Sequence, residues 1–590
     1  MPREISEVEL QPHAVTRKLA IFWTIVAVAT FYSAFILPFR FPLSEPVFSA
    51  AFTAGENNRV AAITLALIGL TVMVVYRWVD HNNSTSFATE QSHDSQLSHK
   101  YLWWGIAAVV AATAILGFFI VRYGEYYADE GYFLTQLRSG IIFHRTIYRE
   151  FEFPYGPLLY WWPEAFIRVL VPFGISVAAA YITSLVAMEA LGIGLLFYIV
   201  NSLPVRRSIK ANAFCLIAFC SVDTVLGMNY AVLRCVLPFA TIVLLTKQES
   251  LRRAIVVACL GETLQLVVSP ELGIAFGGAV LVYGLYRGLT ISWRWLFLSL
   301  AALTGGGIFA AVVGPAYFLT FSQIAKGGYN IILEPQPFIL ILLVALVALA
   351  PIAVARGLWR RNGTDDPAAG MLLALYIATL GMLPAALSRG DPLHAFFNGV
   401  GAYLLSFVAI NQAPLPWRRF WIVLIAIAFA ATQFQELHAF RREILAAVRK
   451  LPHDAYDDPS IVPAISQAVG TAKVSFPWNT PLRMEGTLTQ LGQYEPGYFC
   501  GHYGAFDQAS ELRRIGDMRA AEFALVPIGQ TLVFEDEIDN HGMKRLLRFG
   551  FVYPARKAPF YEGALMFREL TANWVPVGTF GKYTLYHKLR

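Results

Sequence analysis

Two adjacent carboxylates, Asp129 and Glu130, follow the third long apolar run of the chain. If that run ends there as a membrane-spanning helix, both acids lie near the hydrocarbon boundary and face the negative end of the helix macrodipole. Both effects raise the pKa of a carboxyl group and make it a better general base at neutral pH. Because adjacent helical residues point about 100° apart, we expect Asp129 to be the base and Glu130 to orient or support it. Alternatively, the two acids only mark the end of the helix and lie in water.

The segment Arg389-Gly-Asp391-Pro-Leu-His394 occupies a short loop between two other apolar runs. A phosphate group at a membrane surface needs a permanent cation, and arginine supplies one whose planar fork can donate two hydrogen bonds. We therefore predict that Arg389 binds a phosphate, that His394 adds a hydrogen bond to it, and that Asp391 contacts substrate. Lys326, in the loop 321–336, is a second candidate phosphate ligand. Alternatively, Arg389 only extends from a helix end toward water.

A third group of ionisable residues lies within or beside short apolar runs. Arg234, Asp223 and Glu271 fall near helix ends on the same side as Asp129, and Glu262 falls deeper. Ionisable groups at such depth are usually paired or functional, so we predict that Arg234 binds phosphate and that Asp223 and Glu271 bind substrate. An equally consistent interpretation is a pair between Arg234 and a carboxylate that only stabilises helix packing.

Aromatic side chains are dense over residues 151–162, in the sequence Phe-Glu-Phe-Pro-Tyr-Gly-Pro-Leu-Leu-Tyr-Trp-Trp. Rings in this region offer flat apolar surfaces to a sugar, and Tyr132 and Tyr155 are the candidates for that contact. A belt of aromatic residues at the membrane–water interface has the same composition. This second interpretation fits Trp161 and Trp162 better.

Motifs of soluble enzymes are absent: the sequence has no Walker A loop, no Gly-x-Ser-x-Gly, no His-Glu-x-x-His and no paired Cys-x-x-Cys. No cluster of metal ligands is evident, so no cofactor is predicted, although a divalent ion is compatible with the chemistry. Catalysis would therefore use carboxylates, cations and a preformed pocket at the membrane surface.

The composition places these residues in a membrane protein. Of 590 residues, 56% are hydrophobic and 15% are charged, which is too apolar for a water-soluble globule. Apolar blocks such as 60–79 and 101–121 have roughly the 20 residues that cross ~30 Å of hydrocarbon. Because backbone polar groups cannot stay unpaired in lipid, these blocks must be helices. The net charge of +6 is spread over short loops rather than gathered in one patch, which argues against a nucleic-acid partner.

Hydropathy predicts about 13 membrane crossings. The segments are 19–39, 60–79, 101–122, 178–200, 211–228, 231–246, 254–269, 272–287, 294–318, 337–355, 370–388, 395–412 and 419–435. Lys and Arg concentrate in alternate loops, among them those at 206–210, 252–253 and 418–419, which indicates that these loops are cytoplasmic. The N-terminus is then also cytoplasmic, and an odd number of crossings places the tail outside.

The predicted fold is therefore an α-helical polytopic membrane protein with a C-terminal α/β domain. Its three parts are 1–100 with two transmembrane helices and a cytoplasmic loop, 101–436 as the transmembrane core with a long first outer loop at 122–176, and 437–590 as the extracytoplasmic domain. Segments 132–143 and 158–170 of the outer loop are typical of helices that lie in the membrane interface. For the tail we predict strands at 523–527, 531–534, 574–577 and 583–586 and a helix at 508–515.

The order of these features resembles the GT-C class of integral membrane glycosyltransferases, especially the bacterial branch similar to protein mannosyltransferases and lipid A aminoarabinose transferases. An early membrane helix ends in the acidic pair Asp129-Glu130, and a long aromatic outer loop follows. A short hairpin then carries Ser269-Pro-Glu271, and a late Arg-x-Asp-x-x-His element begins at Arg389. The resemblance covers most of the chain from Tyr101 onward, and the two earlier helices precede the usual core.

The resemblance implies that the catalytic base is an acid of the first outer loop, which falls on Asp129. It implies a donor sugar carried on polyprenyl phosphate in the outer leaflet. The implied reaction is an inverting transfer of that sugar to a hydroxyl of a lipid, glycan or protein acceptor. It also implies a location among the lipids of the bacterial inner membrane, with the C-terminal domain in the periplasm.

Two other functions fit part of the sequence. A transporter or flippase of a lipid-linked or small polar substrate predicts internal repeats with broken helices at matching positions, and the sequence contains no such repeat. A polymerase or ligase of surface glycans also uses lipid-linked donors and Arg-rich outer loops, but it does not require the acidic pair.

Overall fold

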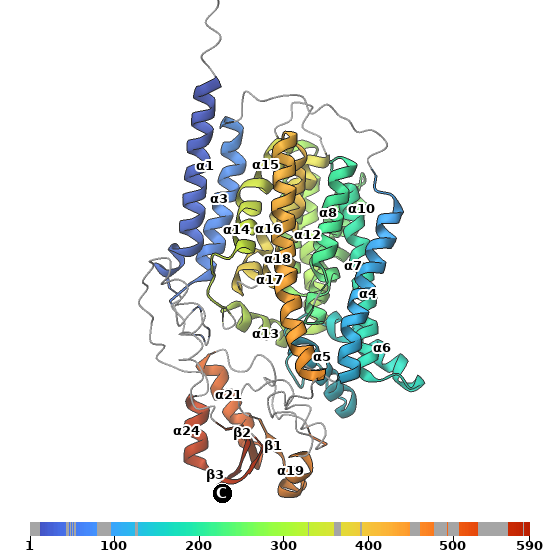
Figure 1. Cartoon of the computed structure of the whole chain (residues 1–590), viewed down its shortest axis with the longest axis vertical. Coiled ribbons are helices and arrows are strands. Elements are labelled where there is room, and N and C mark those ends of the chain that lie inside the picture. Colours follow the sequence, from blue (N-terminus) through green and yellow to red (C-terminus); the bar gives the residue numbers. More distant parts are fainter. Residues whose placement is uncertain are drawn as a thin grey trace, which may run out of the picture.

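The chain folds as a bundle of long helices with a small α/β domain at one end (Figure 1). The computed structural model describes residues 12–42, 47, 49, 51, 55–79, 96–123, 128–222, 224–327, 330–358, 367–389, 392–448, 461–476, 492–493, 507–528, 564–581 and 583–589. The helices of the bundle are α1 (Pro12–Phe35), α3 (Asn58–Val79), α4 (His99–Tyr123), α7 (Val177–Ser202), α8 (Arg207–Cys220), α9 (Val232–Thr246), α10 (Leu251–Val268), α11 (Pro270–Thr290), α12 (Phe297–Val313), α14 (Pro337–Val344), α15 (Ala350–Leu358), α16 (Pro367–Ser388), α17 (Pro392–Asn411) and α18 (Leu415–Val448). A π-helical stretch, η5 (Ala345–Leu349), joins α14 to α15.

Among the described residues, 11 helices are long and apolar enough to cross a membrane. The two remaining predicted crossings correspond to α8, which has only 14 residues, and to α10, which carries Arg252, Arg253 and Glu262. Each predicted crossing therefore contains a helix, and the predicted fold class is confirmed. The prediction for 211–228 was too long, because α8 ends at Cys220 and the chain then turns before the short 3-10 helix η3 (Met228–Tyr230).

The most deeply buried helices are α9 and α17. Buried residues make up 89% of the α9 segment and 94% of the α17 segment, but only 22% of the α4 and α18 segments. A helix that is apolar on all sides belongs inside a bundle, whereas a helix with a wide exposed apolar face meets lipid. The first turns of α9 and α17 are therefore the central positions at one end of the bundle.

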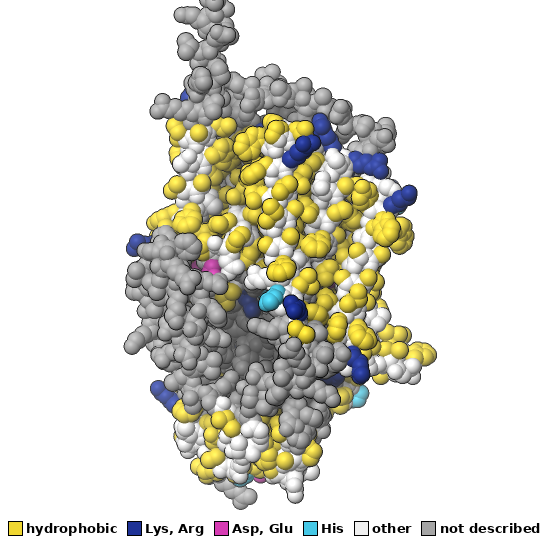
Figure 2. Space-filling view, viewed as in Figure 1, with side chains coloured by type: hydrophobic (Ala, Val, Ile, Leu, Met, Phe, Trp, Pro, Cys, Tyr) yellow, Lys and Arg dark blue, Asp and Glu magenta, His cyan; other side chains and the backbone are white. Residues whose placement is uncertain are grey.

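That end is the one nearest the C-terminal domain, and we call it the tail-facing end. Three shorter helices lie there, namely α5 (Ala128–Phe143), α6 (Leu158–Leu170) and α13 (Pro315–Ala325) (Figure 1). The surface of the bundle is a broad hydrophobic band, and several Lys and Arg side chains lie at the opposite end (Figure 2). Among the exposed cations at that opposite end, Arg206 and Arg207 lie at the start of α8 and Arg419 lies near the start of α18.

The C-terminal domain is a four-stranded sheet of order β1-β2-β4-β3 with helices on both faces. Its elements are α19 (Ile461–Val469), β1 (Val474–Ser475), α21 (Gln508–Arg519), β2 (Phe523–Pro527), α24 (Ala564–Asn573), β3 (Trp574–Phe580) and β4 (Tyr583–Lys588). Strand β1 pairs parallel with β2, and the other pairs are antiparallel.

Alternate side chains of β2 enter two apolar clusters, as the two-residue period of a strand requires. Leu525 packs with Ile465 of α19, and Ala524 and Val526 pack with Met518 of α21 and Leu570 of α24. The predicted strands at 523–527, 574–577 and 583–586 are present, and the one at 531–534 lies outside the described residues.

Candidate functional site

The acidic pair begins a helix instead of ending one. Helix α4 ends at Tyr123, and α5 begins at Ala128, so Asp129 and Glu130 lie in the first turn of α5. The positive end of a helix dipole lies at its N-terminus. The predicted orientation, with the acids at a negative helix end, was therefore wrong, because hydropathy identifies the two helices but not the residue at which the second one begins. The side chains of both acids lie outside the part of the structure that is described.

The centre of the site is a buried pair between Arg234 and Glu271. Arg234 lies in the first turn of α9, its side chain is 8% exposed, and it donates a hydrogen bond to Oε1 of Glu271. The Arg234 guanidinium also donates to the carbonyl oxygen of Asn229 at 2.6 Å. The other carboxylate oxygen of Glu271 accepts a hydrogen bond from the Ser269 hydroxyl at 2.6 Å. Both carboxylate oxygens therefore have a donor, as a buried charge requires.

Local backbone geometry places Glu271 at this point. Ser269 is the only residue between α10 and α11, and its extended conformation (φ −169°, ψ 141°) reverses the chain. Pro270 then occupies the first helical position, where its fixed φ suits a helix start and its missing N–H costs nothing. Glu271 follows in the first turn of α11, where the helix dipole favours a negative charge.

An aromatic cluster connects this pair to α5. The Arg234 guanidinium lies 5.8 Å from the centre of the Tyr155 ring, and the Phe133 ring stacks on Tyr155 at 5.9 Å. Tyr132 stacks on Phe153 at 6.4 Å, and Phe153 contacts Tyr155 edge to face. The two predicted sugar-stacking residues thus belong to one cluster, in which Tyr132 is 2% exposed and Tyr155 is half-buried.

The predicted base, Asp129, belongs to the same helix, α5, as two rings of that cluster. Asp129 precedes Phe133 by four residues, which is about one helical turn. Helix α5 also contacts η3, the segment that carries Asn229 and Tyr230.

His394 reaches the same segment from the first turn of α17. The Tyr230 hydroxyl lies 3.2 Å from Nδ1 and 3.3 Å from Nε2 of His394, and the two rings meet edge to face at 5.3 Å. Tyr230 adjoins Asn229, which accepts a hydrogen bond from Arg234. Four predicted site residues, Arg234, Glu271, Tyr155 and His394, are therefore linked through consecutive contacts.

The two other predicted phosphate ligands lie on neighbouring segments of the same end. Arg389 follows the last residue of α16, Ser388, whose carbonyl accepts a hydrogen bond from the Ile331 N–H at 2.9 Å. Lys326 follows α13, and its Nζ lies 3.8 Å from Oδ2 of Asp507 in the C-terminal domain. A carboxylate of the tail thus already contacts Lys326, which sequence reasoning did not foresee.

Two predicted residues, Asp223 and Asp391, lie outside the described residues. Glu262 is buried in α10, where Gly273 and Gly277 of α11 leave room for its carboxyl group. In the part of the chain that the structure describes, no hydrogen bond or ion pair connects Glu262 to the Arg234–Glu271 pair. Within the described ranges, no three His, Cys, Asp or Glu side chains gather in a way that would hold a metal ion.

The sequence analysis did not identify Tyr230, Asn229 or Ser269 as site residues. The Ser269-Pro-Glu271 hinge is visible in the sequence, since proline at a helix start follows a known preference. The contact between Tyr230 and His394 had no such signal, because it depends on how α17 packs against η3.

The chain matches no known protein-family model, and a search of curated proteins finds no match. Among solved structures it is similar to ArnT from Cupriavidus metallidurans bound to undecaprenyl phosphate, with 12% identity, a TM-score of 0.44, and coverage of 83% of this chain and 98% of that one. For apo ArnT the identity is 13% and the TM-score 0.42, with the same coverage of 83% and 98%. The oligosaccharyltransferase of Archaeoglobus fulgidus, in complex with zinc and sulfate, is 11% identical, with a TM-score of 0.39 and coverage of 81% of this chain and 73% of that one. These likenesses assign no role to any residue of this chain.

Proposed function

We propose that this protein is a GT-C-type glycosyltransferase of the bacterial inner membrane that takes a sugar from a polyprenyl-phosphate donor. One observation carries the proposal: the tail-facing ends of α9, α11 and α17 bring Arg234, Glu271 and His394 into one linked cluster beside an apolar pocket. Charged groups at the end of a membrane bundle suit a phosphate, and an apolar pocket suits its lipid chain. In this proposal the N-terminus is cytoplasmic and the C-terminal domain is periplasmic.

The proposed reaction is an inverting displacement at the anomeric carbon. Asp129 takes the proton of an acceptor hydroxyl on a lipid, glycan or protein, and the oxygen attacks that carbon. The bond from the anomeric carbon to the phosphate oxygen breaks, and polyprenyl phosphate leaves with the electron pair. Fixed cations stabilise the charge that develops on the leaving group. Arg389 is the proposed main cation, Lys326 adds to it, and His394 adds a hydrogen bond.

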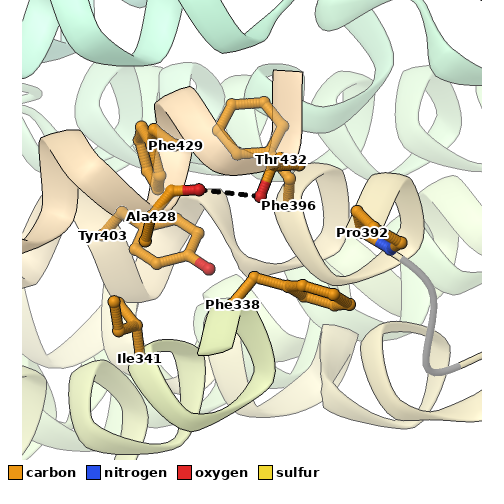
Figure 3. A pocket seen from close by; sticks show the side chains of 8 residues that line it. All are labelled: Phe338, Ile341, Pro392, Phe396, Tyr403, Ala428, Phe429 and Thr432. Atoms are coloured by element: carbon orange, nitrogen blue, oxygen red, sulfur yellow. Dashed lines mark hydrogen bonds between the residues drawn. The ribbon is translucent and has the colours of Figure 1, made fainter. Parts of the chain in front are cut away.

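In this proposal the start of the lipid chain enters between α14, α17 and α18. The apolar cavity there is small, about 10 Å³, which is roughly the space of one water molecule, so its side chains must move apart to admit the chain. It is lined by Phe338, Ile341, Pro392, Phe396, Tyr403, Ala428, Phe429 and Thr432 (Figure 3). The Thr432 hydroxyl donates to the Ala428 carbonyl at 2.9 Å, so Thr432 itself offers no free donor to the pocket. Pro392 lies three residues after Arg389 in the chain, which supports a lipid site near the predicted phosphate ligand.

Replacing Arg389 by Ala is expected to raise the Kd for undecaprenyl phosphate by about 10- to 100-fold, because a charge-assisted hydrogen bond contributes roughly 1.5–3 kcal/mol. Acceptor affinity should change little. Arg168→Ala is the matched control, since Arg168 is 57% exposed and pairs with Glu164 on α6. Titration in nanodiscs measures both, and an unchanged Kd in Arg389→Ala would move the phosphate site elsewhere.

Filling the pocket with Ala428→Phe is expected to weaken undecaprenyl phosphate binding at least tenfold, because overpacking displaces the chain. A water-soluble short-chain prenyl phosphate should lose less. Ile427→Phe is the matched control, because Ile427 is the preceding residue of α18 and is 61% exposed. Equal losses in the two variants would show that the pocket does not hold the chain.

The function itself is tested by a cryo-EM map of the protein in nanodiscs with bacterial polyprenyl-phosphate lipids. Phosphate density between α5 and the Arg389 segment supports the transferase. A pathway that opens to alternate sides, with Asp129 and Arg389 far apart and no lipid bound, would support a transporter instead.

A further inference from the structure

The N-terminal helices, which the sequence places outside the catalytic core, hold the segments that carry Lys326 and Arg389. The chain before α3 packs on the loop 330–336 and on the end of α16. The Ala51 N–H donates to the Asn330 carbonyl at 3.1 Å, and Arg59 donates to the Ala325 carbonyl at 2.6 Å. Ala325 directly precedes Lys326, so α3 contacts the backbone beside one of the two proposed cations.

Asn58 makes the most central of these contacts. Its side-chain amide nitrogen donates to the Ile331 carbonyl at 3.1 Å and to the Leu387 carbonyl at 3.0 Å. The last carbonyls of a helix have no partner inside the helix. Asn58 thus donates to one of these last carbonyls of α16, that of Leu387. The Ile331 N–H donates to the following one, that of Ser388, at 2.9 Å. Because Asn58 is 4% exposed, water does not readily replace its amide.

Glu56 makes the second contact. It has no exposed surface, and its carboxyl oxygens lie 3.1 and 3.3 Å from the Leu333 nitrogen, which donates to them. Its own backbone N–H donates to the Ala51 carbonyl at 2.7 Å, which ties the backbone of Glu56 to Ala51. Burying a carboxyl group costs free energy, and one hydrogen bond from a loop amide offsets only part of that cost. A role in holding the loop explains why a carboxyl group lies here.

We infer that Glu56 and Asn58 are positioning residues for the donor phosphate, because they hold the loop after Lys326 and the end of α16 before Arg389 in one fixed arrangement. The inference rests on the proposed function, since it assigns these residues to the proposed phosphate site. If the inference holds, the hairpin of α1 and α3 is part of the phosphate site. A cation stabilises a phosphate best when its position is set before the ligand arrives.

The test combines hydrogen exchange with undecaprenyl phosphate binding, both on the full chain in nanodiscs. In Asn58→Ala and Glu56→Ala, the Ile331 and Leu333 amides are expected to exchange about tenfold faster, and the Kd for undecaprenyl phosphate should rise roughly tenfold. Glu56→Gln should bind like the native protein, because its amide oxygen still accepts from Leu333. Asn57→Ala is the matched control, since the side chain of Asn57 donates to the Phe41 carbonyl and accepts from the Arg59 N–H, so neither of these hydrogen bonds goes to the loop.

The pH dependence separates positioning by Glu56 from a general loss of stability. Burial raises the pKa of the Glu56 carboxyl well above its ordinary value; the hydrogen bond from Leu333 lowers this pKa in part, and the nearby charge of Glu334 raises it further. A carboxyl group whose pKa is raised by folding stabilises the folded form below its unfolded pKa, about 4.3, and loses that contribution as pH rises through the raised value. Protection of the Leu333 amide, corrected for intrinsic exchange, should therefore fall from pH 5 to pH 8 in the native protein and stay level in Glu56→Gln.

The outcomes separate the inference from the proposed function. Native protein that binds undecaprenyl phosphate, with Ala variants that exchange faster yet bind equally well, overturns the inference alone. Native protein that does not bind undecaprenyl phosphate overturns the proposed function and the inference with it. If Asn58→Ala does not fold, Glu56→Ala decides the question, because its hydrogen bond to the loop goes to the Leu333 amide.

Discussion

Asp129→Asn is expected to lower the rate of sugar transfer by about 10²- to 10⁴-fold, the usual contribution of a general base. Asparagine keeps the size of the side chain but cannot take a proton from the acceptor hydroxyl. Since α5 begins at Ala128 and packs against η3, the substitution lies in the first turn of a helix that contacts the site. The Kd for the donor should stay within about twofold, because the base contacts the acceptor.

Glu130→Gln is the matched control, one residue further along the same helical turn. It should lose less activity, because adjacent helical residues point about 100° apart and only one can face the hydroxyl. Single-turnover transfer in nanodiscs, with the donor binding measured in parallel, distinguishes the two variants. Near-normal turnover in purified Asp129→Asn would show that another group is the base, and Glu271 would be the next candidate.

Arg234→Met is expected to destabilise the protein by about 3–5 kcal/mol, the usual cost of leaving a buried charge without its partner. Methionine fills a similar volume, so the loss comes from Glu271, whose Oε1 then has no donor while its side chain is only 21% exposed. The Asn229 carbonyl also loses its hydrogen bond from Arg234, and the η3 segment loses a contact that fixes it. Thermal unfolding in detergent, followed by tryptophan fluorescence, measures the change.

The double variant Arg234→Met, Glu271→Leu tests the cause. Replacing both members of a buried ion pair by apolar groups is often close to neutral, so the double variant should recover most of the stability but none of the activity. A double variant as unstable as Arg234→Met would mean that the packing of Arg234 on Tyr155, at 5.8 Å from the ring centre, dominates instead.

The sequence by itself determined the membrane fold and most of its helices. In lipid, an apolar run of about 20 residues must form a helix, because its backbone polar groups have no other partners. Each predicted crossing contains a helix. The strands of the tail follow from the same kind of local rule, since alternation with a period of two is a property of the strand itself. The identities of Arg234, Glu271 and His394 as candidates also came from local features, because ionisable groups inside apolar runs are costly.

Only the tertiary structure decided which of these candidates meet. Arg234 and Glu271 are 37 residues apart, and Tyr230 and His394 are 164 apart, so their contacts depend on the packing of α9, α11 and α17. Asp129 changed from a helix end to a helix start because α5 begins at Ala128, four residues before the start predicted at 132.

Glu56 gave no signal in the sequence, since its partner Leu333 lies 277 residues away. The hydropathy pattern along the chain indicates which segments meet lipid and which meet water, and this is enough to identify the membrane helices. Contacts between distant segments depend on the shapes of all the helices that pack between them, and those shapes exist only in the folded bundle.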